Sequence, residues 1–217
     1  MANDCYYDMV AVGPKDKLER LIDIMHYEDK GKERYYIYRV FEAGIGRDME
    51  PVPDDPKGRY WVAICGDVAW SADRWVHDEP HKEPTADGLY VTLPFLSAEL
   101  GIDFEVFTEE SGIGFQEHYV IIGGKLVVEQ CVDYAEPYFE DEEDMAEVVG
   151  YLARVTREGT LTDVDVGSLI LETIERMQAG ESPISIRMGG FRDWGADYRF
   201  ATEGPKWIEN GNYEFLS

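Results

Sequence analysis

The sequence predicts an α+β fold in which two helices cover one face of an antiparallel sheet. Three observations predict it: apolar strand-like segments alternate with two helical ones, two apolar runs flank a pair of glycines, and hydrophobic residues make up 44% of the 217-residue chain. A chain of this length and composition can bury a sizeable core. Aromatic residues, at 13%, are more frequent than in acidic chains that stay unfolded.

The first half of the chain alternates between strand-like and helical segments. Apolar and aromatic residues from Cys5 onward stop at Gly13-Pro14, where proline suits the first turn of a helix. Prolines and glycines within residues 42–58 predict a loop, and the polar stretch 66–88 is expected to be irregular. The predicted strands are residues 5–12, 33–41, 59–65 and 102–108, and the predicted helices are residues 18–25 and 93–100.

The clearest local pattern is a β-hairpin. Residues 119–122 and 126–128 are apolar runs on either side of Gly123-Gly124. A two-residue turn of this kind needs positive φ, which glycine adopts without steric cost. Gly101 follows the second predicted helix and suits the left-handed position after a helix C-terminus.

The order strand, helix, strand, strand, helix, strand is that of the split βαβ unit, the ferredoxin-like fold. We therefore expect a ferredoxin-like domain at residues 1–135, widened by the hairpin. Residues 136–217 are expected to form an acidic, helical and aromatic C-terminal extension packed on this domain. Apolar residues at helical spacing within 145–155 and 166–177 predict two helices there.

The charge of the chain is strongly unbalanced, with 45 acidic against 20 basic residues and a net charge of -25. This excess disfavours a nucleic-acid binder and favours a basic partner. Spread evenly over roughly 10,000 Å² of folded surface, it amounts to about one charge per 400 Å², sparser than the phosphates of duplex DNA. A nucleic-acid mimic would have to gather its carboxylates on one face; otherwise the charge only solvates the protein.

Cysteine content and hydropathy predict a cytoplasmic protein. No apolar run approaches the roughly 20 residues needed to cross a bilayer, and the N-terminus lacks the basic and apolar regions of a signal peptide. Cys5, Cys65 and Cys131 are odd in number and far apart, so we expect reduced core residues rather than disulfides.

Three short segments together resemble a known family. They are Gly66-Asp-Val-Ala-Trp70-Ser71, then Glu109-Glu-Ser-Gly112-Ile-Gly114-Phe115-Gln116-Glu117-His118, and finally Glu129-Gln-Cys131-Val132. These segments resemble the YubB-type ferredoxin-like domain of plasmid, conjugative-element and phage proteins. The resemblance spans residues 1–140, and it implies a fold and a mobile-element setting without catalytic residues to carry across.

The setting implied by this resemblance gives the charge a context. Mobile elements must survive restriction enzymes and CRISPR effectors, many of which bind nucleic acid through basic channels. We therefore expect a non-catalytic inhibitor of the anti-CRISPR or antirestriction type, with DNA mimicry as one mode of action. Its expected partner is the basic surface of such a host protein, and no cofactor, membrane or direct nucleic-acid contact is expected.

The acid run at residues 129–147 is the predicted partner-binding segment. It contains no Lys or Arg, and aromatic residues of the kind that anchor protein interfaces lie among its acids. Part of the run also has a structural explanation, since acids in the first turn of a helix complement the helix dipole. The predicted binding residues are Glu129, Asp133, Tyr134, Glu136, Tyr138, Glu140, Asp141, Glu142, Glu143, Asp144 and Glu147.

Catalytic alternatives depend on the histidines. His77 and His81 have the spacing of two metal ligands on a helix, but Pro80 between them would break that helix and favours a solvated loop. His118 follows Glu117 and could form an acid/base pair, although a hydrogen-bonded strand histidine is the simpler interpretation. A metal-dependent enzyme that acts on nucleic acid through carboxylates and histidine stays an alternative, as does a mobile-element maintenance or scaffold protein.

Overall fold

The structure is a computed structural model that describes residues 4–25, 35–37, 39–80, 88–135, 138–139, 175–176, 179, 184–185, 188–189 and 200. The chain divides into two compact units. The first comprises Met1–Ile113, Glu117–Cys131 and Asp193–Asn212, and the second comprises Gly114–Gln116, Val132–Arg192 and Tyr213–Ser217. Most of the described residues belong to the first unit.

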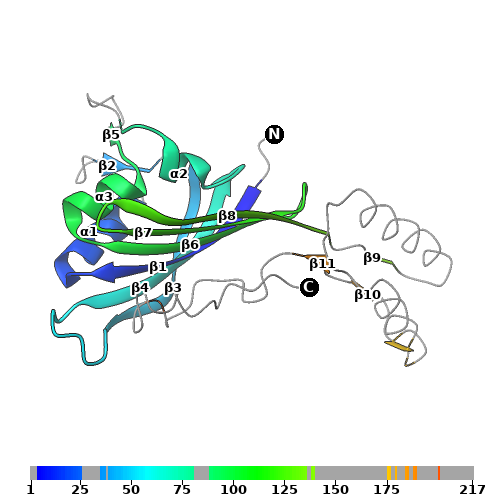
Figure 1. Cartoon of the computed structure of the whole chain (residues 1–217), viewed down its shortest axis with the longest axis horizontal. Helices are drawn as coiled ribbons and strands as arrows, with labels where there is room; N and C mark the ends of the chain where they lie inside the picture. The colour runs from blue at the N-terminus through cyan, green and yellow to red at the C-terminus, as the bar shows by residue number, and fades with distance from the viewer. Residues whose placement is uncertain are drawn as a thin grey trace. The chain divides into compact units, whose positions relative to one another are not determined.

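A seven-stranded sheet dominates the described chain, with strand order β11-β8-β7-β6-β1-β4-β3 (Figure 1). β1 pairs antiparallel with both β4 and β6, and β3 pairs antiparallel with β4 at one edge of the sheet. The strands are β1 (Asp4–Gly13), β3 (Val40–Pro51), β4 (Tyr60–Ala69), β6 (Asp103–Glu110), β7 (Phe115–Ile122), β8 (Lys125–Ala135) and β11 (Met188–Gly189). Two short pairs join β2 (Tyr35–Tyr36) to β5 (Leu89–Tyr90), and β9 (Tyr138–Phe139) to β10 (Ile184–Ser185).

Three described helices contribute to the core, namely α1 (Lys15–Met25), α2 (Asp73–His77) and α3 (Leu93–Leu100). α1 and α3 lie against the same face of the sheet (Figure 1). Trp75 of α2 packs edge-on against Tyr7 of β1, with ring centroids 5.0 Å apart. No helix in the described part of the chain is long and apolar enough to cross a membrane. The buried side chains of this core include Cys5, Tyr7, Met9 and Ala11 of β1, Leu18 and Leu21 of α1, and Leu96 of α3.

Glycines fix the ends of α3 and the β7–β8 hairpin. Gly101 follows α3 with φ of 68°, and Gly123 and Gly124 have φ of 56° and 79°. The N–H of Gly124 donates to Ser97 Oγ at 2.8 Å, and the N–H of Gly123 donates to Asp103 Oδ1 at 3.1 Å. The predicted helix at residues 93–100 and the predicted hairpin are therefore confirmed.

The predicted ferredoxin-like α+β class is wrong. The described residues form mainly an antiparallel sheet, and the three helices are short, with 11, 5 and 8 residues. β1, α1, β4, α3 and β6 overlap predicted elements, whereas the strand predicted at residues 33–41 coincides only with β2 and the first residues of β3, and α2 and β5 were not predicted. These elements account for only part of a wider sheet, because β7, β8 and β11 also pair into it.

The loop predicted at residues 42–58 is wrong over its first half, where β3 continues to Pro51. Glycine and proline are tolerated there because β3 is an edge strand, and its pairing with β4 is irregular. Its register shifts lie between Val40 and Glu42, between Ile45 and Arg47, and between Arg47 and Glu50. β4 likewise continues through Gly66 to Ala69, where irregular chain was expected.

Candidate partner-binding site

The face of the sheet opposite the helices carries acidic side chains in rows. Paired residues of neighbouring strands place their side chains on the same face. Tyr6 of β1 pairs with Glu109 of β6 and with Asp67 of β4, and Asp67 pairs in turn with Glu42 of β3. One row across four strands therefore holds three carboxylates and one phenol ring.

The next row adds a fourth carboxylate, since Asp8 pairs with Phe107 on one side and with Cys65 on the other, and Cys65 pairs with Gly44. Each sheet position occupies about 4.8 Å by 6.8 Å, so these two rows cover roughly 260 Å², or about one carboxylate per 65 Å². That density is about three times the value expected for an even spread of all 45 acidic residues over the folded surface. Together with Asp4, which pairs with Ala69, these residues form the acidic patch: Asp4, Asp8, Glu42, Asp67 and Glu109.

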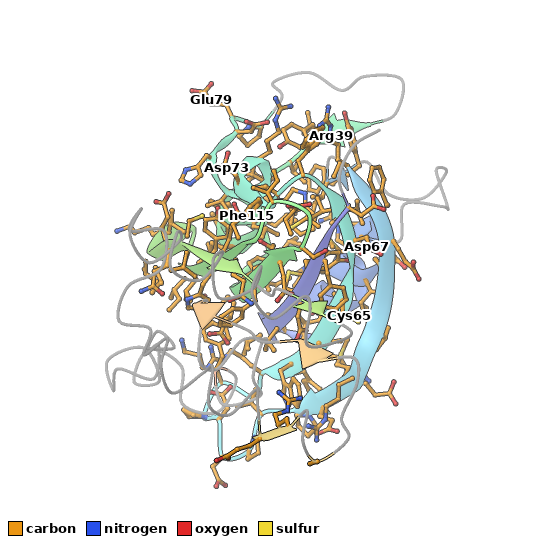
Figure 2. All side chains as sticks on the ribbon, turned by 90° about the vertical axis from the view of Figure 1, so that its right-hand side faces the viewer. Arg39, Cys65, Asp67, Asp73, Glu79 and Phe115 are labelled. Atoms are coloured by element: carbon orange, nitrogen blue, oxygen red, sulfur yellow. The ribbon has the colours of Figure 1, made fainter. Side chains whose placement is uncertain are left out.

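The acidic patch lies at the exposed end of this face. Asp4 and Glu42 are exposed, while Asp8, Asp67 and Glu109 are half-buried. Arg39, Asp67 and Cys65 follow one another down the right-hand side of Figure 2. Farther along the same strands the face is closed to solvent, since Val10 and Glu105 are buried.

Crowding of like charges changes the proton affinity of the patch. Burial, followed by the charges of Glu42 and Asp4, raises the pKa of the Asp67 carboxyl above its usual value. Burial is also the main cause that raises the pKa of Tyr6 to about 12, with contributions from Cys65, Asp8 and Asp67. Neither Glu42 nor Asp67 forms an ion pair with another residue in the described ranges. These two carboxylates therefore contribute negative charge that no described cation neutralises in an ion pair.

A β-bulge shapes the β3 side of the patch. Val40 pairs with Val68 and Glu42 pairs with Asp67, so Phe41 is an extra residue on β3. Bulges of this kind re-aim side chains, and the ring of Phe41 is 58% exposed. The carbonyl of Glu42 turns toward β4 and accepts a hydrogen bond from the Tyr7 hydroxyl at 3.2 Å.

Exposed aromatic rings border the acidic patch. Besides Phe41, Tyr6 is 41% exposed and Trp70, directly after β4, is 45% exposed. Trp70 has φ of 72°, a left-handed conformation that residues with a bulky side chain rarely adopt. Large apolar side chains in solvent next to carboxylates are typical of a protein-binding surface.

A buried carboxylate fastens the chain after Trp70 to the sheet. Glu117 of β7 accepts hydrogen bonds from Ser71 Oγ at 2.7 Å and from the Ala72 N–H at 3.1 Å. It also accepts from Thr108 Oγ1 at 2.6 Å and from the Tyr119 hydroxyl at 3.0 Å. The segments singled out in the sequence at residues 66–71 and 109–118 therefore meet at this carboxylate.

His118 lies on the opposite face of β7 from Glu117 and is fully buried. Its Nε2 lies 3.1 Å from Glu105 Oε1, its Nδ1 lies 3.3 Å from Gln130 Oε1, and its ring stacks on Phe107 at 4.2 Å between centroids. His118 is thus a hydrogen-bonded strand histidine beside Glu105, and Glu117 makes its contacts elsewhere.

Few of the residues predicted to bind a partner fall within the described chain. Glu129 is exposed on β8, with its carboxylate 3.1 Å from His77 Nε2. Asp133 and Tyr134 belong to β8, and Tyr138 of β9 pairs with Ser185 of β10. Glu136, Glu140, Asp141, Glu142, Glu143, Asp144 and Glu147 lie outside the described residues, so a role for this segment stays a prediction.

The described part of the chain holds no group of three or more His, Cys, Asp or Glu side chains that could bind a metal ion. His77 contacts Glu129 and, at 3.8 Å, Asp73, while His81 lies outside the described residues. The three cysteines were expected to be core residues, but this is confirmed only for Cys5, because Cys65 is half-buried and Cys131 is exposed.

Comparisons with known proteins found no match among family models, curated proteins or solved structures. The candidate site therefore stands on its own geometry. The sequence prediction missed the acidic patch, although one signal for it was present. Asp4, Tyr6 and Asp8 alternate with the core residues Cys5 and Tyr7, which is typical of a strand with one buried and one acidic face.

Proposed function

We propose that the protein is a cytoplasmic, non-catalytic inhibitor that binds the basic nucleic-acid-binding surface of a host defence protein through the acidic patch. The main observation in support of this proposal is a row of side chains across four paired strands, formed by Glu109, Tyr6, Asp67 and Glu42. The mobile-element setting comes from the resemblance of the sequence to YubB-type proteins. Restriction enzymes and CRISPR effectors are the partners that this setting favours.

The spacing of the patch suits a surface that normally holds phosphates. Neighbouring strands are about 4.8 Å apart, so the carboxylates of Asp67 and Glu42 project from adjacent strands at close range. A basic groove that neutralises phosphates at a few ångströms of spacing gains the same favourable contacts from such carboxylates. Complementary charge of this density also speeds encounter between the two proteins.

Among the described residues, Arg47 is a basic residue on the same face as the acidic patch, farther along β3. Arg47 is placed over the ring of Trp61, 5.0 Å from its centroid, and its Nε lies 3.6 Å from Glu50 Oε1. The guanidinium of Arg47 therefore contacts Trp61 of β4 and Glu50 of β3.

The test measures DNA cleavage by a panel of purified restriction endonucleases and CRISPR nucleases with the full chain added. We expect the wild-type chain to inhibit at least one enzyme in a stoichiometric and salt-sensitive manner. The double variant Glu42→Gln/Asp67→Asn should inhibit that enzyme more weakly. Its matched control, Asp48→Asn/Glu99→Gln, removes the same charge from exposed positions on β3 and α3 and should inhibit like wild type.

Two results would count against the proposal. If no enzyme in the panel is inhibited at micromolar concentrations of the chain, the assigned function is wrong. If both double variants inhibit like wild type, the function holds but the acidic patch is not its site. Cleavage of DNA by the chain alone, abolished by a chelator, would instead support the metal-dependent enzyme.

A further inference from the structure

We infer that Trp70 is a pre-formed anchor of the acidic patch and stacks on an arginine side chain of the partner. The inference rests on the proposed function, because it names the chemical group that the same surface recognises. A large apolar side chain is held in solvent, on a backbone conformation that glycine would adopt at lower cost.

The strained backbone at Trp70 is fixed from both sides. Before it, the N–H of Ala69 donates to the carbonyl of Arg39 at 3.1 Å, which closes the end of the β3–β4 ladder. After it, the N–H of Ser71 donates to the carbonyl of Ala69 at 3.0 Å. Glu117 then holds both Ser71 Oγ and the Ala72 N–H. The turn has no freedom to relax while these bonds persist.

Glu117 is itself immobilised. It is 5% exposed, and the hydroxyls of Thr108 and Tyr119 fix its carboxylate from the core side. Ser71 Oγ further accepts the N–H of Asp73 at 2.9 Å, so the start of α2 belongs to the same unit. A left-handed non-glycine residue persists only where its surroundings over-determine it, and such residues cluster at ligand-binding positions. These contacts therefore hold the exposed ring of Trp70 in a position from which it can bind a ligand.

Carboxylates close to Trp70 along the chain and across the ladder favour a cationic occupant. Asp67 and the exposed Asp73 lie three residues before and after it, and Asp4 pairs with its neighbour Ala69. The face of an indole ring carries partial negative charge and attracts a guanidinium or ammonium group. Arginine fits best, because its planar group stacks on the ring while its N–H groups donate to carboxylates. An anionic lipid surface or a nucleic acid would be repelled by the same carboxylates.

The experiment uses the full chain and two labelled peptides, nona-arginine and nona-lysine, followed by fluorescence anisotropy at 50 and 150 mM salt. Both peptides carry the same charge, so a difference between them reports stacking and bidentate bonding. Wild type should bind nona-arginine more tightly than nona-lysine. Trp70→Ala should weaken nona-arginine binding about tenfold and remove the preference.

Controls separate this inference from the proposed function and from misfolding. Trp70→Gly relieves the strained φ and should melt at a higher temperature than wild type while losing the same affinity. Ile113→Ala removes another exposed apolar side chain and should bind both peptides like wild type. If Trp70→Ala keeps the arginine preference while Glu42→Gln/Asp67→Asn loses affinity, the anchor is wrong and the acidic patch stands. If neither variant changes binding, the anchor is wrong and the acidic patch is not the site that binds cationic side chains.

Discussion

Gly66 lies directly against the carbonyl group of Glu42, so closely that a methyl group on Gly66 would overlap the carbonyl oxygen. The contact exists because the Phe41 bulge swings this part of β3 over β4. The position of Glu42 in the acidic patch therefore depends on the absence of a side chain at Gly66 on the neighbouring strand.

Gly66→Ala should therefore destabilise the protein by about 1–3 kcal/mol, because the bulge must shift to admit the methyl group. Urea denaturation measures the free energy of unfolding. Gly44→Ala is the matched control on the facing strand, since a methyl group there meets its nearest atom, the Cys65 carbonyl oxygen, at an ordinary 3.7 Å. Equal costs for the two variants would show that the bulge adapts freely.

Asp67→Asn should stabilise the protein at neutral pH. Because burial and neighbouring acids raise the pKa of Asp67, the folded state holds its proton more tightly than the unfolded state. The stability contributed by this group is fully present below its ordinary pKa of 3.8 and is lost as pH rises through the raised value. The gain in melting temperature should therefore appear above about pH 4 and vanish below it. Asp48→Asn, which removes one charge from an exposed position of β3, should show a smaller gain; an identical profile would refute the local explanation.

Glu117→Gln should cost about 1–3 kcal/mol of unfolding free energy, because an amide replaces charge-assisted hydrogen bonds and offers one acceptor oxygen in place of two. The Ala72 N–H can only donate, so it competes for that oxygen with the hydroxyls around it. Chemical denaturation compares this variant with Glu99→Gln on the exposed side of α3, for which no loss is expected. A cost near zero would show that the three hydroxyls reorient freely.

Replacement of residues 140–144 by serine tests the predicted acid run independently. If the run contributes to the interface, the variant should bind the partner more weakly and with a flatter salt dependence. Binding assays at several salt concentrations measure both quantities against Glu42→Gln/Asp67→Asn. Unchanged affinity in the serine variant would remove the segment from the site and leave the acidic patch as the binding surface.

Local patterns in the sequence predicted local structure well. Gly123-Gly124 specified a hairpin because few other residues adopt positive φ at two successive positions, and Gly101 marked the end of α3 for the same reason. The apolar and aromatic run from Cys5 located β1, and apolar residues within 102–108 located β6, since both strands contribute side chains to the core. The buried, hydrogen-bonded state of His118 also agreed with the simpler interpretation of its position in a strand.

The pairing of strands that are distant in the chain could not be predicted from the sequence. The fold class was wrong because periodicity shows that a strand exists without showing how many strands pair into one sheet. The acidic patch was missed because its members come from β1, β3, β4 and β6 and become neighbours only through register. Residues 129–147 were predicted to bind a partner because their acids are contiguous in sequence. Contiguity in sequence is a weaker guide to local surface charge than pairing between strands.

The Phe41 bulge lies on an edge strand, and the Trp70 turn lies beyond the end of β4. Neither feature contributes to the ladder between β1 and β6, which supports the hydrophobic core. Under the proposed function, the exposed side chains of Phe41 and Trp70 can therefore be exchanged without any change in that ladder.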